Sequence, residues 1–274
     1  MQYAVYEFYT KDENERDWIV ALLGDHHFEG FEETNDSLKA YVPSAKIRPL
    51  LVKELLHDND LGDIRFTEKQ LEEKNWNEEW EKNFEPITIG SKVGIRAPFH
   101  KPLNTEYELV IEPKMSFGTG HHPTTASVVE LMMEIDFTGK SVLDFGSGTG
   151  VLAILAEKLK AAKVLAIDNE EWAYNNCLEN TAANGCVGIS CVLGNETYRF
   201  TEQYDVILAN INRNVIMQNI EKWKGLMKPG AVMLVSGILQ SDEMIILNEA
   251  QRIGLAKNAI KRNNGWLAIS FSAL

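Results

Sequence analysis

The first 67 residues alternate short strand-like and helix-like patterns of hydrophobic and polar positions. Residues 2–10 are aromatic and β-branched, which indicates a strand, and apolar residues at helical spacing follow over residues 14–24. Two strand-like runs then flank a polar turn, Ser44 is placed to cap a second helix, and residues 63–68 can form a last strand. The apolar helix positions are Trp18, Ile19, Leu22 and Leu23 in the first helix and Ile47, Leu50, Leu51, Leu55 and Leu56 in the second. The order β-α-β-β-α-β predicts a small α+β, ferredoxin-like domain over residues 1–67.

A charged segment separates this domain from the rest of the chain. Residues 68–85 contain neither Gly nor Pro, and Trp76 and Trp80 lie four positions apart, on one face of the helix that the pattern predicts. The two tryptophans either dock the helix on a neighbouring domain or contact a substrate. We therefore expect residues 68–92 to form a linker helix and a short connection.

From residue 93 onward, apolar strands alternate with helices. Uninterrupted apolar runs at 164–167 and 206–209 are typical of strands buried on both faces of a parallel sheet, with helices expected over 170–184 and 214–226. Near the end of the chain, two strand-like runs meet at a turn and predict an antiparallel hairpin at the sheet edge. Residues 93–274 are thus predicted to form a doubly wound α/β domain.

The charge of the chain is concentrated in its first third. The 274 residues carry a formal charge of −13; residues 1–90 contribute 21 Asp and Glu against 10 Lys and Arg, and residues 91–274 contribute 19 against 17. Such a field repels phosphate backbones and anionic lipid surfaces, so no direct nucleic-acid or membrane partner is expected. An acidic first domain suits a lysine-rich protein partner.

The cysteines and the N-terminus favour a cytoplasmic protein. Cys177, Cys186 and Cys191 form no Cys-x-x-Cys pair, which argues against a disulfide framework or a zinc site. The first residues lack a basic region, and no segment approaches the ~18 apolar residues of a membrane span. We expect an unanchored, monomeric protein.

A strand, a glycine-rich loop and a helix follow one another at residues 142–155. Gly146, Gly148 and Gly150 allow the backbone to turn sharply and to approach a ligand, but they lack the third-glycine position of the dinucleotide fingerprint. Asp144, just before the loop, is a poor neighbour for a pyrophosphate and a suitable one for a cationic sulfonium cofactor. Asp168 ends the next strand, where a carboxylate either binds two ribose hydroxyls or caps the following helix.

Two further polar segments carry candidate chemistry. In the loop at residues 112–125, Phe117 and His122 can form a wall of a pocket, and Thr124 and Thr125 open a helix whose free N–H groups and hydroxyls can hold a carboxylate. The adjacent histidines lack further ligands at workable spacing, so no metal site is expected. Asn210 follows a buried strand and can orient an amine through its carbonyl oxygen.

The glycine motif together with Asp168 resembles class I S-adenosylmethionine-dependent methyltransferases over residues 93–274. The combination of MSFGTGHHPTT, LDFGSGTG, AIDN and LANINRN behind an acidic domain resembles the PrmA family, which methylates large-subunit ribosomal protein eleven. Methyltransferases of bases or glutamine usually carry Asn-Pro-Pro-Tyr where this chain has Asn-Ile-Asn-Arg. The resemblance implies S-adenosylmethionine as cofactor, S-adenosylhomocysteine as product, and transfer to the α-amine and lysine ε-amines of that protein.

The resemblance also implies which residues contact the cofactor, and other functions remain as alternatives. Thr125, Gly146, Asp168 and Asn210 match the cofactor-contacting positions of the family, and no motif supplies a dedicated general base. The alternatives are a methyltransferase acting on RNA or a small molecule, a nicotinamide-dependent dehydrogenase, and a cofactor-binding protein without catalysis.

Overall fold

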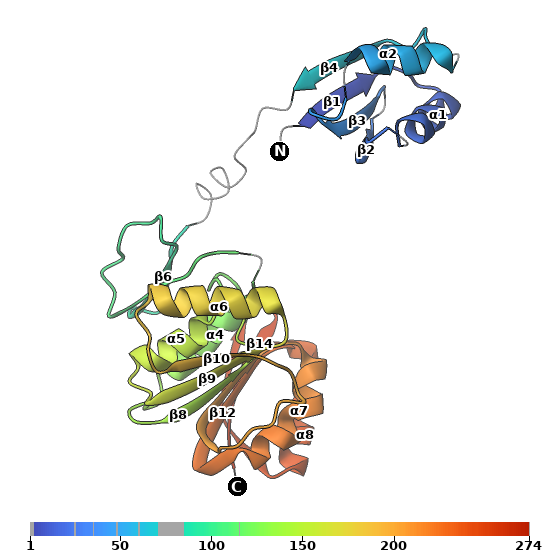
Figure 1. Cartoon of the computed structure of the whole chain (residues 1–274). Coiled ribbons are helices and arrows are strands. Elements are labelled where there is room, and N and C mark those ends of the chain that lie inside the picture. The colour runs from blue at the N-terminus through green and yellow to red at the C-terminus, as the bar shows by residue number, and fades with distance from the viewer. Residues whose placement is uncertain are drawn as a thin grey trace. The chain divides into compact units, whose positions relative to one another are not determined.

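The computed structural model describes residues 3–24, 26–34, 36–47, 49–59, 61–70, 85–114 and 116–273. The chain divides into two compact units, Met1–Asn83 and Phe84–Leu274 (Figure 1). No helix within these described ranges is long and apolar enough to cross a membrane.

The N-terminal unit has the ferredoxin-like topology that the sequence predicts. Its sheet is antiparallel with the strand order β2-β3-β1-β4, which is the split βαβ arrangement. The buried side chains of its two helices pack on Tyr6 and Phe8 of the central strand. The elements are β1 (Tyr3–Phe8), α1 (Glu13–Gly24), β2 (Gly30–Glu33), β3 (Leu38–Pro43), α2 (Pro49–Asp58) and β4 (Phe66–Gln70).

Details of the second helix differ from the prediction. Ser44 does not cap it, because residues 43–46 form a turn closed by the Lys46 N–H on the Pro43 carbonyl at 2.8 Å, and α2 begins at Pro49. With this start the buried stripe runs through Val52 and Leu56. Leu50 and Leu51, which were predicted on the apolar face of this helix, are therefore exposed. Trp18, which was predicted on the apolar face of the first helix, is exposed as well.

The end of this unit also differs. Strand β4 pairs with β1 as far as Gln70, so residues 68–70 belong to the sheet and not to a linker helix. The remainder of the predicted linker helix, with Trp76 and Trp80, falls on residues 71–84, outside the described residues.

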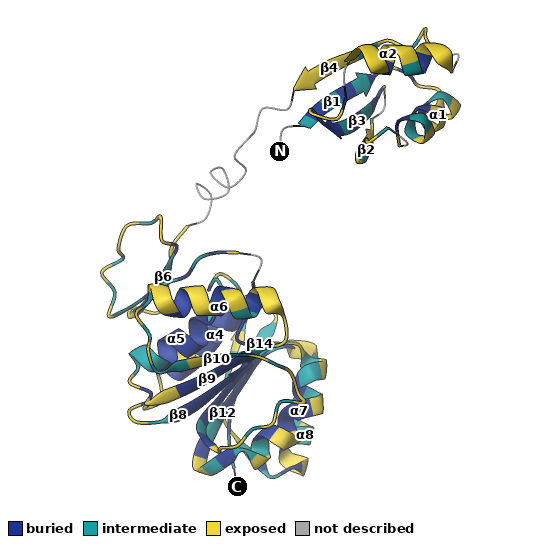
Figure 2. Cartoon of the chain, viewed as in Figure 1, coloured by how far each residue is buried: buried dark blue, intermediate teal, exposed yellow. Residues whose placement is uncertain are grey.

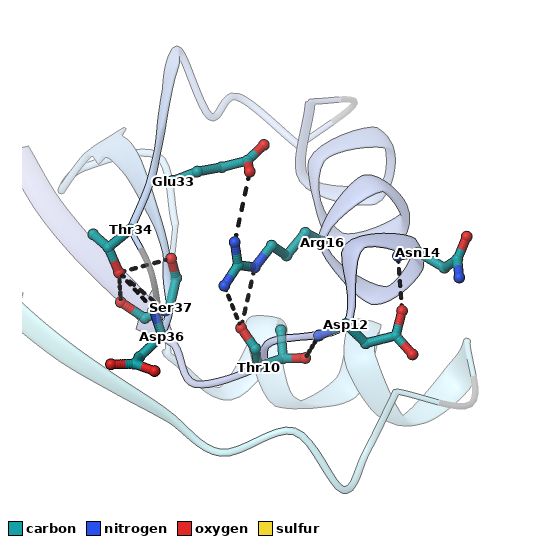
Figure 3. Close-up of polar contacts among 8 residues, drawn as sticks. All are labelled: Thr10, Asp12, Asn14, Arg16, Glu33, Thr34, Asp36 and Ser37. Atoms are coloured by element: carbon teal, nitrogen blue, oxygen red, sulfur yellow. Dashed lines mark hydrogen bonds and ion pairs between the residues drawn. The ribbon is translucent and has the colours of Figure 1, made fainter.

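A buried arginine joins the start of α1 to the end of β2 (Figure 3). Asp12 caps α1 by accepting the N–H of Asn14 at 2.8 Å. One turn into the helix, Arg16 is 7% exposed, donates from Nε and Nη2 to the Thr10 carbonyl, and pairs with Glu33 at 3.6 Å. The guanidinium thus satisfies the Thr10 carbonyl in the loop that connects β1 to α1.

The C-terminal unit is built on a seven-stranded sheet with helices on both faces. The strand order is β10-β9-β8-β11-β12-β14-β13; the first five strands are parallel, and β14 and β13 run antiparallel as the predicted C-terminal hairpin. The strands are β8 (Ser141–Phe145), β9 (Lys163–Asp168), β10 (Ile189–Leu193), β11 (Tyr204–Asn210), β12 (Met227–Leu239), β13 (Leu255–Asn263) and β14 (Trp266–Ala273).

Two hydrophobic cores flank this sheet, because successive strand residues point to opposite faces. Val142 of β8 belongs to the core under α4, α5 and α6, and its neighbour Leu143 belongs to the core under α7 and α8. Figure 2 shows the central strands buried and the outer face of α6 exposed. The helices are α4 (Pro123–Met132), α5 (Val151–Lys158), α6 (Glu171–Ala183), α7 (Arg213–Gly225) and α8 (Glu243–Arg252).

A small three-stranded sheet, which the sequence did not predict, precedes the first helix of this unit. It consists of β5 (Ile87–Ile89), β6 (Val93–Arg96) and β7 (Tyr107–Val110), and β5 pairs with β6 ahead of residue 93, where the domain was expected to start. Two asparagines at the end of α6 fix the chain as it leaves β7. Asn184, the C-cap residue of α6, bonds to the N–H and the carbonyl of Val110, and Asn180 accepts the N–H of Glu112.

The order of the strands fixes where a ligand can bind. The chain runs outward from β8 to β9 and β10 on one side, and from β11 to β12 on the other. In open sheets of this kind, ligands bind at the carboxyl ends of the strands where the order reverses, which here is between β8 and β11.

Candidate functional site

A cavity of about 360 Å³ lies at this switch point. It brings together seven of the nine residues that the sequence proposed as a site: Phe117, His122, Thr124, Gly146, Gly148, Asp168 and Asn210. The remaining lining residues are Asn169, Trp172, Ala173, Ile211, Asn212, Gly237 and Trp266.

The glycine loop forms the floor of the cavity and is held by a second loop. Gly148 has a φ of +53°, and a Cβ at this position would lie 2.3 Å from the carbonyl oxygen of Phe117. Thr149 fastens the contact, since its N–H donates to Phe117 O at 3.0 Å and its hydroxyl donates to Gly118 O at 2.7 Å. Gly148 thus allows one protein segment to approach another, in addition to the sharp turn and the approach to a ligand that the sequence suggested.

Asp168 lies at the rim of the cavity, at the end of β9. One carboxylate oxygen accepts the N–H of Gly148 at 2.8 Å, and the other accepts the N–H of Glu170 at 3.1 Å. Glu170 occupies the N-cap position of α6, although its side chain makes no capping hydrogen bond, so Asp168 is not the N-cap residue that was its alternative role. Each carboxylate oxygen keeps a further lone pair for a ligand hydroxyl.

Asp144 lies behind the glycine loop and does not line the cavity. Its side chain is fully buried, and one oxygen accepts the N–H of Ala153 in the first turn of α5 at 3.1 Å. Burial raises its pKa to about 7, the charge of Asp168 adds to this effect, and the Ala153 bond opposes it. Its geometry is that of a buried anchor for the helix start.

His122 is the N-cap of α4. Its Nδ1 accepts the N–H of Thr124 at 3.3 Å and lies 2.7 Å from the Thr124 hydroxyl, so the proton of the neutral ring is on Nε2. The ring makes edge contacts with Phe117 at 5.1 Å and with Trp266 at 4.9 Å between centroids. An aromatic wall therefore joins the residue 116–122 loop to the C-terminal hairpin.

Asn210 ends β11 and lines the same cavity. Its Nδ2 donates to the Thr125 hydroxyl at 3.3 Å, and its Oδ1 is buried without a hydrogen-bond partner in the part of the chain that the structure describes. Thr125 is itself fully buried and does not line the cavity. The threonine thus orients the amide, which lines the cavity while its Oδ1 is buried and unpaired.

Sequence reasoning missed the remaining walls. Trp172 lies four residues after Asp168, in the first turn of α6. Trp266 reaches the cavity only because β14 pairs with β12. Gly237 offered a signal, since a glycine inside a buried strand often marks a bulge. The register of β12 shifts there, and a Cβ on Gly237, whose φ is +84°, would lie 2.1 Å from Ile211 O.

The predicted site residues do not extend to the other cavity or to a cluster of metal ligands. A second cavity of about 500 Å³ belongs to the N-terminal unit and includes Lys53, His57 and Arg65, but none of the predicted site residues. Among the described residues, no three His, Cys, Asp or Glu side chains are grouped as metal ligands would be.

The parallel sheet, its antiparallel β14, and the cavity at the switch point define the class I methyltransferase fold. The crystal structure of a ribosomal protein L11 methylase from Lactobacillus delbrueckii subsp. bulgaricus shares this fold, with a TM-score of 0.65 and 23% identity, over 69% of this chain and 99% of that one.

Sequence comparisons identify the family. The family model described as ribosomal protein L11 methyltransferase (PrmA) matches residues 9–273. A protein named ribosomal protein L11 methyltransferase from Phocaeicola vulgatus is 40% identical, and one from Bacteroides fragilis is 37% identical, each over 99% of both chains. The chain belongs to the PrmA family of ribosomal protein L11 methyltransferases.

Proposed function

We propose that this protein transfers methyl groups from S-adenosylmethionine to the α-amino and lysine ε-amino groups of ribosomal protein L11, as a monomer in the cytoplasm. The cavity between β8 and β11 carries the proposal, because it places the Asp168 carboxylate, a glycine floor and the Asn210 amide around one space. Membership of the PrmA family supports the same reaction and the same client.

The side chains of the cavity fit the proposed cofactor. Asp168 has lone pairs for the two ribose hydroxyls, and Gly146 and Gly148 leave the floor free of side chains. The volume of about 360 Å³ is within the range of small-molecule sites. When bound, S-adenosylmethionine supplies a methyl group activated by its sulfonium.

The opposite wall suits an amine. The Asn210 amide lines the cavity, and its unpaired Oδ1, once turned toward the ligand, can accept an N–H and so orient the nitrogen lone pair. Phe117, His122 and Trp266 shield the approach from water. His122 is committed at Nδ1 to the cap of α4, so it acts as a wall and not as a general base. A lysine with an ordinary pKa of ~10.4 therefore loses its proton to solvent before it reacts.

The N-terminal unit is proposed to recognise the client. Of the formal charge of −13, a net −11 lies in residues 1–90, and ribosomal proteins that bind RNA are rich in lysine. Charge attraction then brings the client to the enzyme, and the C-terminal unit performs the transfer.

Methyl transfer to ribosomal proteins from cells that lack this modification tests the proposal. With radiolabelled S-adenosylmethionine, we expect label in ribosomal protein L11 and none in RNA. Asn210→Ala should lower turnover at least tenfold, whereas Asn214→Ala, an exposed asparagine outside the cavity, should match the wild type. Label in RNA alone, or full turnover by Asn210→Ala, would contradict the proposal.

Calorimetry tests cofactor binding independently of the protein substrate. The purified protein should bind S-adenosylmethionine and not NAD, and Asp168→Ala should weaken that binding at least tenfold because both ribose contacts are lost. Binding of NAD alone would support the dehydrogenase alternative.

A further inference from the structure

Two thiols meet beneath the glycine loop. Cys177 lies on α6 and Cys191 on β10, and their sulfur atoms are 3.4 Å apart. Both are free thiols, and they come from elements that pack against each other in the C-terminal unit. None of the functions proposed above uses them.

Cys177 supports the cavity from below. It is 1% exposed, and a Cβ on Gly150 would lie 2.6 Å from its sulfur, so the thiol is in contact with the last glycine of the loop. One helical turn before it, Ala173 lines the cavity. A shift of this sulfur therefore changes the packing between α6 and the glycine loop.

The two thiols differ in reactivity. Hydrogen bonds from Cys177 and Thr181 hold the pKa of Cys191 below its ordinary value, against the effect of burial. The same hydrogen bond between the two thiols, together with burial and the nearby Asp144, raises the pKa of Cys177. Cys191 is also only partly buried, so it is both the more accessible thiol and the better nucleophile.

We propose that Cys177 and Cys191 are a peroxide-sensitive modification site that forms an intramolecular disulfide and thereby weakens ligand binding in the cavity. The Cys191 sulfur attacks a hydroperoxide; the S–O bond forms, the O–O bond breaks, and water or an alcohol leaves. The sulfur of Cys177 then attacks the sulfenic acid; the S–S bond forms, the S–O bond breaks, and water leaves. The dithiol loses two electrons and two protons, which the peroxide takes up.

The change in the cavity follows from distance. A disulfide has an S–S length of ~2.05 Å, so the sulfurs must approach by about 1.4 Å from their separation of 3.4 Å. Because Cys177 touches Gly150, this shift displaces the packing under the loop that carries Gly146 and Gly148.

Thiol counting with mass spectrometry on the full chain tests the chemistry. After hydrogen peroxide, we expect the free thiols to fall from three to one, a mass loss of about 2 Da, and a Cys177–Cys191 cross-linked peptide. The sulfur contact is between Cys177 and Cys191, so Cys186→Ser should form the same disulfide and is the matched control. Cys177→Ser should instead stop at a sulfenic acid on Cys191 that dimedone traps.

Three results would overturn the modification site: a wild type that keeps three thiols, a disulfide that includes Cys186, or overoxidation without a disulfide. The wild type and Cys186→Ser suffice for this decision even where Cys177→Ser does not fold.

Calorimetry with S-adenosylmethionine tests the effect on the cavity, and this arm rests on the proposed function. The oxidised wild type should bind at least tenfold more weakly, and dithiothreitol should restore binding. Equal binding by both forms would overturn the effect on the cavity. If the reduced protein does not bind S-adenosylmethionine, the proposed function fails while the thiol counts still decide the modification site.

Discussion

The buried carboxylate of Asp144 makes the stability of the C-terminal unit depend on pH. Its pKa is raised by burial to about 7 in the folded protein, against an ordinary value of 3.8. The folded state therefore holds a proton that the unfolded state releases. The resulting stability is fully present below pH ~4 and is lost as the pH rises through about 7. Roughly three pKa units at ~1.4 kcal/mol each set the loss at no more than about 4 kcal/mol.

Asp144→Asn removes this titration and keeps an oxygen for the Ala153 N–H. Between pH 4 and pH 8, the wild type should lose up to about 4 kcal/mol more in free energy of unfolding than the variant. Urea unfolding followed by pulsed hydrogen exchange of the peptide that carries β8 and α5 measures this unit alone. Glu196→Gln, which changes an exposed carboxylate of the same unit, should retain the wild-type pH slope. Parallel pH curves for the wild type and Asp144→Asn would refute the reasoning.

Three further predictions concern the loop, a second carboxylate and the client. Gly148→Ala should lower the melting temperature and weaken cofactor binding at least tenfold, because its Cβ meets Phe117 O; Gly139→Ala, with a φ of +71° and no atom within 4 Å, should cost only about 1 kcal/mol of strain. Asp205 has a pKa of about 2, because burial raises it but hydrogen bonds from Lys228 and Ser141 outweigh burial; Asp205→Asn should be less stable than the wild type at pH 7, with the difference closing toward pH 2 in the same urea assay. Raising the salt concentration should weaken binding of ribosomal protein L11 far more than binding of the cofactor, as titrations at two ionic strengths would show.

Local signals account for the parts of the fold that the sequence predicted. The apolar runs of β9 and β11 and the Asn-Gly turn before β14 are each readable within a few residues. The strands β5, β6 and β7 have three or four residues each, which is too short for a periodic pattern to emerge. Ser44 misled the prediction because a capping residue type also suits the turn that it occupies. The helix α8 was not predicted, although Ile246 and Ala250, which the structure buries, are spaced four positions apart in the sequence, as on one face of a helix.

The site was predictable where its residues flank a motif, and not where the tertiary fold supplies them. Asp144 is next to the glycine loop in sequence, yet all five residues of β8 are buried, so adjacency could not show that its carboxylate faces away from the cavity. Trp266 is the opposite case, because nothing near it in the sequence suggests a ligand. The pairing of β14 with β12 brings its ring to His122. Such placements depend on strand order, which a single sequence does not encode locally.

The glycines of the cavity have a different role from the one that their spacing suggested. Gly148 lies against the carbonyl of Phe117, and Gly237 lies against the carbonyl of Ile211. Each is a point where two walls of the cavity touch through their backbones, and a side chain at either point would separate them. The glycines thus fix the distance between the walls, while Asp168 and Asn210 supply the polar groups that face the ligand. A substitution at such a contact should therefore change the shape of the cavity and impair cofactor and amine positioning together, whereas loss of Asn210 should affect mainly the amine.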